Sequence, residues 1–204
     1  MIRTWMADVS ALLQEDVYRK YYEVVPVYRK EKADKLRFQK DKALSVGAWV
    51  LFERMREEYK LGEGTVFNLS HSGTYVLCSI DDTGAEDKKV GCDLEEMKEE
   101  RMKIAERFFC ESEYKYILNH PGSFYRYWVL KESFMKATRF GMKLGLNEFE
   151  IEYKTSSEPV LVKKPDDIDG DYYFKEYDVA PLKYKVAVCA SEKNFEEKIK
   201  IINL

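Results

Sequence analysis

The sequence has few cysteines and no long apolar run. Its four cysteines form no C-x-x-C pair and are irregularly spaced, which excludes a dense disulfide framework and argues against a zinc knuckle. The longest apolar stretch, residues 43–52, is about half of what a bilayer requires. An acidic residue, Asp8, comes before any apolar run of signal-peptide length. We therefore expect a reduced, soluble, cytoplasmic protein without a membrane segment.

Neither sign of charge dominates the chain. Thirty-four Lys and Arg stand against 37 Asp and Glu, for a formal net charge of -3, which argues against a general nucleic-acid coat protein. Aromatic residues make up 14% of the 204 residues, too many for a disordered chain. A chain of this length buries roughly 70% of its unfolded surface, so it needs neither a disulfide nor a metal to fold.

The hydrophobic pattern predicts helical segments followed by three strands, twice. The first half has an expected helix over 29–60 and strands over 65–69, 74–80 and 89–95. The second half has expected helices over 101–118 and 123–139 and strands over 148–153, 172–178 and 184–190. Two prolines and the acidic run 166–171 indicate an exposed loop between the last strands.

This repeated order predicts an α+β fold. We expect a pseudo-dimer of two similar halves, residues 1–98 and 99–204, each with helices packed on a three-stranded antiparallel sheet. The two halves would form one compact unit. The seam between them is the expected place for a ligand cleft.

The first candidate site is the run Gly-Cys-Asp-Leu-Glu at residues 91–95. On a strand, Asp93 and Glu95 project from one face, while Cys92 and Leu94 point into the core. Two carboxylates on one face repel each other unless a cation or a donor lies between them. Such a pair suits Mg²⁺, which takes oxygen ligands and completes its shell with water and phosphate. The alternative is a solvated strand end, since more glutamates follow directly.

The second candidate is the helical run 128–136. Glu132 and Lys136 are one turn apart and share a face. Glu132 would supply a third carboxylate or a base, while Lys131 and Lys136 would neutralise phosphate. The alternative is an ordinary surface Glu–Lys pair. A different, apolar face of this helix is expected to carry Tyr127, Leu130, Phe134 and Ala137.

Two further runs suggest anion binding. Ser70-His71-Ser72 lead from a strand into a turn, where hydroxyls, backbone N–H groups and the imidazole can bind phosphate; the alternative is a plain polar turn. Residues 29–42 hold seven basic and three acidic side chains, and Lys32 and Lys35 share a helix face. This segment suits a phosphate-rich ligand or an acidic partner protein, or is simply a solvated helix face.

The order of these motifs resembles the 4'-phosphopantetheinyl transferase family, and most of all its longer, surfactin-synthetase-activating type. The order is Ser-His-Ser, Gly-x-Asp-x-Glu, Phe-Phe-x-x-x-Glu-Tyr and Trp-x-x-Lys-Glu-x-x-x-Lys. These motifs stand at residues 70–72, 91–95, 108–114 and 128–136. The clear resemblance covers about residues 67–140, and the Asp-x-Glu with the Trp-x-x-Lys-Glu is specific as a pair.

The resemblance implies a monomeric enzyme that moves the phosphopantetheine arm of coenzyme A to a serine of an acyl or peptidyl carrier protein. The reaction would depend on Mg²⁺ and release adenosine 3',5'-bisphosphate, with neither nucleic acid nor membrane as partner. Metal ligands implied are Asp93, Glu95 and Glu132. The catalytic groups implied are Glu132, Asp93 and Lys136. Glu132 is the candidate base that takes the serine proton, and a metal-bound water is the alternative base. Coenzyme A would contact Ser70, His71, Lys131 and Lys136, with Lys32 and Lys35 near its 3'-phosphate.

Three departures from the family pattern stand out. The Gly-Lys-Pro expected upstream of Ser-His-Ser is replaced by Gly62-Glu63-Gly64-Thr65, so one lysine contact is missing. Val129 stands where Ser or Thr is common, and the chain is short for the type. Two other functions stay open: a metal-dependent nuclease or phosphodiesterase, and a non-catalytic carrier-domain binder.

Overall fold

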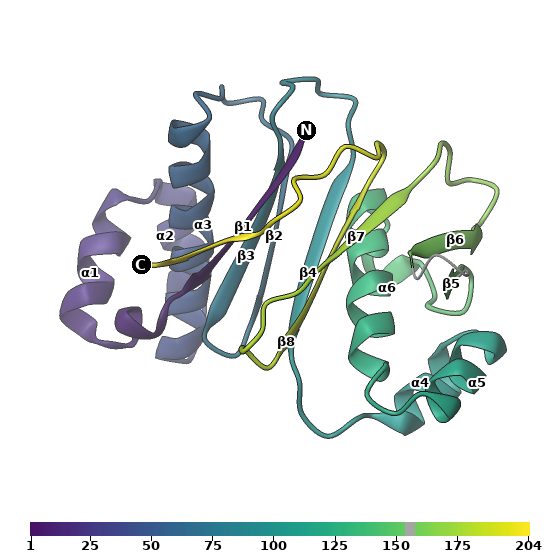
Figure 1. The fold of residues 1–204 in the computed structure, drawn as a ribbon. Helices are drawn as coiled ribbons and strands as arrows, with labels where there is room; N and C mark the ends of the chain where they lie inside the picture. The colour runs from purple at the N-terminus through teal and green to yellow at the C-terminus, as the bar shows by residue number, and fades with distance from the viewer. Residues whose placement is uncertain (154–157) are drawn as a thin grey trace.

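The computed structural model describes residues 1–153 and 158–204, arranged as helices, sheet, sheet and helices (Figure 1). The first sheet has the strand order β2-β3-β1-β9. Its strands are β1 (Ile2–Asp8), β2 (Phe67–Ser72), β3 (Tyr75–Asp81) and β9 (Lys200–Asn203). Neighbouring strands are antiparallel except β1 and β9, which are parallel. The outer face of this sheet is covered by α1 (Glu15–Val24), α2 (Val27–Asp34) and α3 (Gln39–Glu58), after a short 3-10 turn, η1 (Ser10–Leu13).

The second sheet is antiparallel, with the strand order β4-β8-β7-β6-β5. Its strands are β4 (Val90–Glu96), β5 (Glu150–Tyr153), β6 (Pro159–Lys163), β7 (Tyr173–Tyr177) and β8 (Tyr184–Ala190). Helix α6 (Phe124–Thr138) packs on this sheet, and α4 (Met102–Phe108) and α5 (Glu111–Asn119) lie beside it (Figure 1). A 3-10 turn, η2 (Gly141–Lys143), follows α6.

Side chains along β1 and β3 point alternately to the two faces of the first sheet. They therefore contribute to two separate hydrophobic cores, one on each face. Trp5 and Cys78 belong to the core under α3, whereas Met6 and Leu77 belong to the core between the sheets. Leu94 of β4 joins that central core from the second sheet. A third core lies between α6 and the second sheet. The two sheets therefore form one continuous body.

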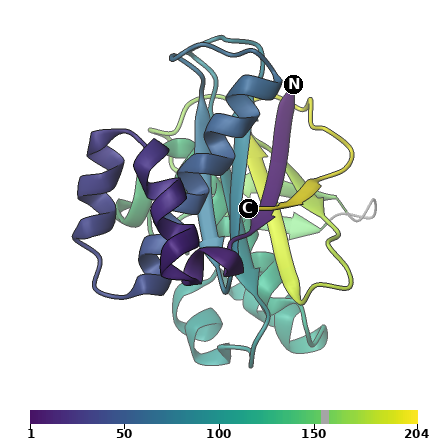
Figure 2. The ribbon, with the colours of Figure 1, turned by 90° about the vertical axis from the view of Figure 1, so that its left-hand side faces the viewer.

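The expected α+β class and the antiparallel strands 65–69, 74–80, 89–95 and 184–190 are confirmed, with boundaries within three residues of those of β2, β3, β4 and β8. The expected three-stranded sheets were wrong, since the described residues form sheets of four and five strands. The strands that the sequence missed are short or carry charge: β1, β6 and β9. Strand β9 comes from the second half of the chain yet pairs beside β1 in the first sheet (Figure 2).

Two of the expected helices are each divided in two. The helix expected over 29–60 breaks after Asp34, because Phe38 takes an extended conformation (φ -101°, ψ 139°) before α3 begins. The helix expected over 101–118 breaks where Cys110, also extended, becomes the N-cap of α5. Both breaks lie at residues without Pro or Gly, so the usual helix-breaking signals are absent. None of the helices among the described residues is long and apolar enough to cross a membrane.

Candidate active site at the seam between the sheets

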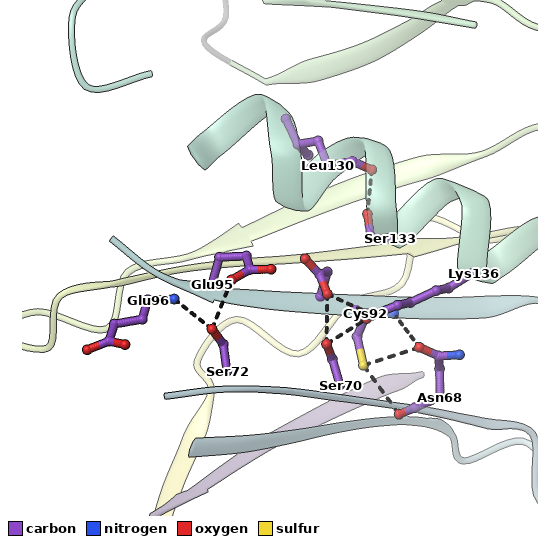
Figure 3. Close-up of polar contacts among 10 residues, drawn as sticks. Asn68, Ser70, Ser72, Cys92, Glu95, Glu96, Leu130, Ser133 and Lys136 are labelled. Carbon is purple, nitrogen blue, oxygen red and sulfur yellow. Dashed lines mark hydrogen bonds and ion pairs between the residues drawn. The ribbon is translucent and has the colours of Figure 1, made fainter. Parts of the chain in front are cut away.

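The site lies where β2 approaches β4, two strands that belong to different sheets. Alternate side chains of β2 reach across to β4 (Figure 3). The Ser70 hydroxyl donates to Asp93 Oδ1 at 2.7 Å, and the Ser72 hydroxyl donates to Glu95 Oε2 at 2.8 Å. The Glu96 backbone N–H donates to Ser72 Oγ at 3.1 Å. The spacing of two residues in Ser-x-Ser and in Asp-x-Glu is thus the spacing of one strand face.

The same face of β2 also holds the β4 backbone. The Asn68 side-chain oxygen accepts the Cys92 N–H at 3.0 Å, and the Cys92 thiol contacts the Asn68 carbonyl at 3.2 Å. Burial raises the pKa of the Cys92 thiol to about 12, so the thiol stays neutral. As predicted, Cys92 and Leu94 are buried in the core. The seam between the sheets is therefore closed by side chains of β2.

Lys136 of α6 completes this polar cluster. Its ammonium donates to Asp93 Oδ1 at 2.7 Å, to Ser70 Oγ at 2.9 Å and to the Cys92 carbonyl at 3.2 Å. Burial favours the neutral amine, but the charge of Asp93 outweighs it, and the pKa of Lys136 is raised. Three residues predicted from separate motifs, Ser70, Asp93 and Lys136, therefore meet at one point as a charged pair with a hydroxyl.

The carboxylates of the predicted metal site fit a cation chemically. Asp93 is 4% exposed, and its second oxygen, Oδ2, is buried and has no hydrogen-bond partner among the residues that the structure describes. Burial and the negative charge of Asp93 raise the pKa values of both Glu95 and Glu132. Carboxylate oxygens are the kind of ligand that Mg²⁺ prefers, and a bound cation would offset the repulsion between these carboxylates. Within the described residues, however, no three His, Cys, Asp or Glu side chains are gathered closely enough to hold a metal ion.

Gly91 sets how closely α6 approaches β4. A Cβ atom at this position would lie 2.1 Å from the Ser133 carbonyl oxygen and 2.3 Å from the Ala137 nitrogen. The helix therefore rests directly on the strand backbone, which glycine alone allows. This contact brings Lys136 over Asp93, so the glycine of Gly-x-Asp-x-Glu is required by packing.

Lys131 differs from its predicted role as a coenzyme A contact, because its side chain is completely buried. Its ammonium lies 2.8 Å from Glu113 Oε1 and donates to the carbonyls of Leu146 and Phe149 at 2.7 and 2.9 Å. Glu113 also accepts the backbone N–H of Ile151 at 2.9 Å. Both charged side chains are at most 1% exposed, and burial raises the pKa of Glu113 and lowers that of Lys131. The pair joins α5, α6 and β5.

A pocket of about 370 Å³ borders the cluster on the side of α2. It is lined by two predicted residues, Lys32 and His71, by Arg29, which sequence reasoning missed, and by one carboxylate, Asp41. Lys35 is not among its lining residues. It caps the C-terminus of α2 in a right-handed helical conformation, and its predicted contact with the 3'-phosphate stays a prediction.

A second, smaller cavity of about 140 Å³ lies at the other end of β2. Its walls include Ser72, Glu95, Arg101 and Trp128. The Ser70–Asp93–Lys136 cluster therefore stands between a basic pocket and a cavity with an aromatic wall. Such an arrangement suits a reaction in which a phosphate-rich donor and a second reactant approach from opposite sides.

Comparison with known proteins agrees with this geometry. Residues 89–189 match the family model described as the 4'-phosphopantetheinyl transferase superfamily. The chain is 35% identical over 142 residues to the 4'-phosphopantetheinyl transferase Sfp of Bacillus subtilis (strain 168), covering 67% of this chain and 60% of that protein. It is 34% identical to psf-1 of Bacillus pumilus, over 67% of this chain and 57% of the relative.

A third relative gives a similar result over a shorter span. The chain is 36% identical over 118 residues to the 4'-phosphopantetheinyl transferase gsp of Aneurinibacillus migulanus, covering 51% of this chain and 48% of that protein. The chain thus spans at most about three-fifths of the length of these relatives. The matched residues include β4 and α6, which carry Asp93, Glu95, Glu132 and Lys136. On this match, the chain belongs to the 4'-phosphopantetheinyl transferase superfamily.

Proposed function

We propose that this chain transfers the 4'-phosphopantetheine arm of coenzyme A to a serine of an acyl or peptidyl carrier protein. The observation that carries the proposal is the Ser70–Asp93–Lys136 cluster between two cavities, together with the family match. The serine oxygen attacks the phosphorus that bears the pantetheine arm. The bond from that phosphorus to the bridging oxygen of the pyrophosphate breaks, and adenosine 3',5'-bisphosphate leaves. The serine proton passes to a base.

The residues divide these tasks. Lys136, kept protonated by Asp93, lies where a pyrophosphate between the two cavities would need a positive charge. Arg29, Lys32 and His71 line the pocket for the nucleotide phosphates. Glu132 is the candidate base, because it is a partly exposed carboxylate one helical turn from Lys136 and near Asp93.

Asp93, Glu95 and Glu132 would hold a Mg²⁺ ion, and the buried, unpartnered Asp93 Oδ2 supports that assignment. When bound, the ion offsets the charge that builds on the phosphate oxygens. We further propose that the chain acts as a cytoplasmic monomer, with residues 1–98 and 99–204 as the two halves of a pseudo-dimer. The helix-on-sheet arrangement on each side of the seam supports two similar halves, although β4 and β9 each lie in the sheet of the other half.

The test is a mass-shift assay over a panel of apo carrier proteins with coenzyme A and Mg²⁺. We expect a gain of one phosphopantetheine group, and Asp93→Asn should abolish it while leaving the protein folded. Asp81→Asn is the matched control, since Asp81 is a similarly buried aspartate of the neighbouring sheet that contacts Thr83 instead of the cluster. Transfer by Asp93→Asn at the parent rate would contradict the proposal.

The same assay separates the alternatives. A non-catalytic binder would capture a carrier protein without changing its mass. A metal-dependent nuclease would degrade DNA or RNA supplied with Mg²⁺ and leave the carriers unchanged. Either result, obtained with carriers that another transferase modifies, would replace the proposed function.

A further inference from the structure

The turn between β2 and β3 connects the Ser72 end of the site to both sheets. Ser72 and Tyr75 are partners in the register of the two strands, so the turn consists of Gly73 and Thr74 alone. Gly73 takes the left-handed backbone conformation, with a φ of +62°, and glycine is favoured at this position of a two-residue turn. The Thr74 carbonyl accepts the Val9 N–H at 2.9 Å, so the chain directly after β1 holds one side of the turn.

Tyr184 of β8 holds the other side of the turn, from the second sheet. Its hydroxyl oxygen accepts the Thr74 N–H at 3.4 Å. A Cβ atom at Gly73 would lie 2.0 Å from the same oxygen, so the hydroxyl lies directly against the turn. The Tyr184 ring meets the Tyr75 ring edge-on, with centroids 5.0 Å apart, and both rings pack against the core between the sheets. These contacts fix the ring and therefore the place of its hydroxyl.

The turn determines where Ser72 lies relative to the second sheet. Ser72 directly precedes Gly73; its hydroxyl donates to Glu95 Oε2 at 2.8 Å, and its oxygen accepts the Glu96 N–H at 3.1 Å (Figure 3). Glu96 is the partner of Tyr184 in the register of β4 and β8. Tyr184 thus contacts the turn from the strand that pairs with the Glu95–Glu96 end of β4. A movement of the turn away from Tyr184 would lengthen the bond between Ser72 and Glu95.

We propose that Tyr184 is a positioning residue for the transfer reaction, because its hydroxyl fixes the turn and thereby keeps Ser72 on Glu95. The inference rests on the proposed function, in which Glu95 belongs to the reacting site. Tyr184 is not among the described residues that line the 140 Å³ cavity or the 370 Å³ pocket, so it acts through Ser72 and not by contact with a substrate. Motif spacing gives no sign of this role, since Tyr184 lies 110 positions after Thr74.

The test is Tyr184→Phe, which removes the hydroxyl and keeps the ring and its contact with Tyr75. With a carrier protein that the parent modifies, we expect kcat to fall about five-fold, the effect of one net hydrogen bond. Coenzyme A affinity, measured by isothermal titration without Mg²⁺, should stay unchanged, because the β2 residues that line the 370 Å³ pocket end at His71, before the turn. Exchange of the Thr74 amide hydrogen, measured by NMR, should become about five-fold faster.

Tyr177→Phe is the matched control. Tyr177 of β7 packs in the same central core, and its hydroxyl donates to the Glu196 carbonyl at 2.8 Å, away from the turn. Each variant loses one hydroxyl contact, so both should lower the urea midpoint. Only Tyr184→Phe should lower kcat and speed exchange of the Thr74 amide. If both variants lowered kcat equally, Tyr184 would have a structural role alone and the inference would be overturned.

A double-mutant cycle with Ser72→Ala shows whether Tyr184 acts through Ser72. Once the serine hydroxyl is absent, Tyr184→Phe should lower kcat by less than about two-fold, because two changes that act on the same contact are not additive. A loss of about five-fold in the Ser72→Ala background as well would show that the two residues act independently, and would overturn the inference.

The outcomes also separate the inference from the function on which it rests. Failure of the parent to modify any carrier protein would overturn both. Transfer by the parent, with kcat or Thr74 exchange unchanged in Tyr184→Phe, would overturn the inference alone. So would a loss of coenzyme A affinity equal to the loss of kcat, because the substitution would then have loosened the whole site.

Discussion

Replacing Gly91 by alanine should separate α6 from β4. The added methyl group would meet the Ser133 carbonyl oxygen at 2.1 Å and the Ala137 nitrogen at 2.3 Å. Both are backbone atoms of a helix, so neither can rotate away, and α6 would have to withdraw by roughly an ångström to restore ordinary contact distances. Overpacking of this kind typically costs about 1–3 kcal/mol. We expect about 3 kcal/mol here, because two backbone atoms obstruct the same methyl group.

Urea denaturation of the parent and the variant measures this cost. The unfolding midpoint should fall while the slope of free energy against urea stays unchanged, because the fold and its buried surface remain the same. Coenzyme A binding should also weaken, since withdrawal of α6 moves Lys136 away from Asp93. The second readout links the packing of the glycine to the function of the cluster.

Gly62→Ala is the control for this substitution. It introduces the same methyl group, but no atom lies within 4 Å of the new Cβ, so stability should change by less than about 1 kcal/mol. If Gly91→Ala lowered the midpoint no more than Gly62→Ala, the close contact between α6 and β4 would be refuted as the reason for the glycine.

Three other predictions concern charges. Lys131→Met should cost about 3–5 kcal/mol in urea denaturation, because Glu113 would be left buried without its cation; a loss below 1 kcal/mol would contradict this. Lys136→Met should weaken coenzyme A binding more than about ten-fold in titration calorimetry, a loss of about 1.4 kcal/mol; unchanged affinity would make Lys136 a structural residue. Burial opposes ionisation of Asp82, but its ion pairs with the Met1 ammonium and with Arg3 prevail and lower the pKa of Asp82. Its contribution to stability is therefore present above the ordinary carboxyl pKa and is lost as the pH falls through the lowered value. Asp82→Asn should cost about 1 kcal/mol at pH 7, and the two proteins should converge in acid; a constant difference across the pH range would contradict the ionic origin.

The central part of the site followed from simple periodicity. A period of two predicted that Asp93 and Glu95 share a strand face, and a spacing of four predicted that Glu132 and Lys136 share a helix face. The structure places Lys136 on Asp93 through the packing of α6 on β4. Periodicity alone did not reveal that contact, because it depends on how two elements pack together whose contacting residues are 43 positions apart.

The burial of Lys131 could have been predicted from its helical position, although its charge suggested an exposed residue. The position is four residues after Tyr127 and three before Phe134, and so lies on the predicted apolar face of α6. A position on the apolar face of the helix is expected to be buried, provided that an opposite charge is available for the lysine. Glu113, in another motif, supplies the charge. The partner was not predictable, because pairing depends on how α5 packs beside α6.

Lys35 illustrates a different limit, in which spacing does not choose between neighbouring pairs of cations. Positions 29 and 32 are three residues apart, and so are positions 32 and 35, so either pair shares a helix face. Arg29 and Lys32 line the pocket beside β2, and Lys35 is not among its lining residues. Which pair borders a pocket depends on how α2 packs against α3 and β2, and periodicity does not contain that information.

Burial divides the motif residues into two groups with different tasks. Gly91, Glu113 and Lys131 make only internal contacts, whereas Glu132 and Lys136 keep partial access to solvent beside the cavities. Asp93 belongs to both groups, since one oxygen is held by Ser70 and Lys136 and the other is buried with no partner in the described part of the chain. A motif match cannot separate these tasks, because a motif gives residue types and spacing but does not show what each side chain contacts. The ligand contacts of this chain should therefore be sought among the partly exposed motif residues and Asp93 Oδ2, and the packing residues should affect binding only through the position of α6.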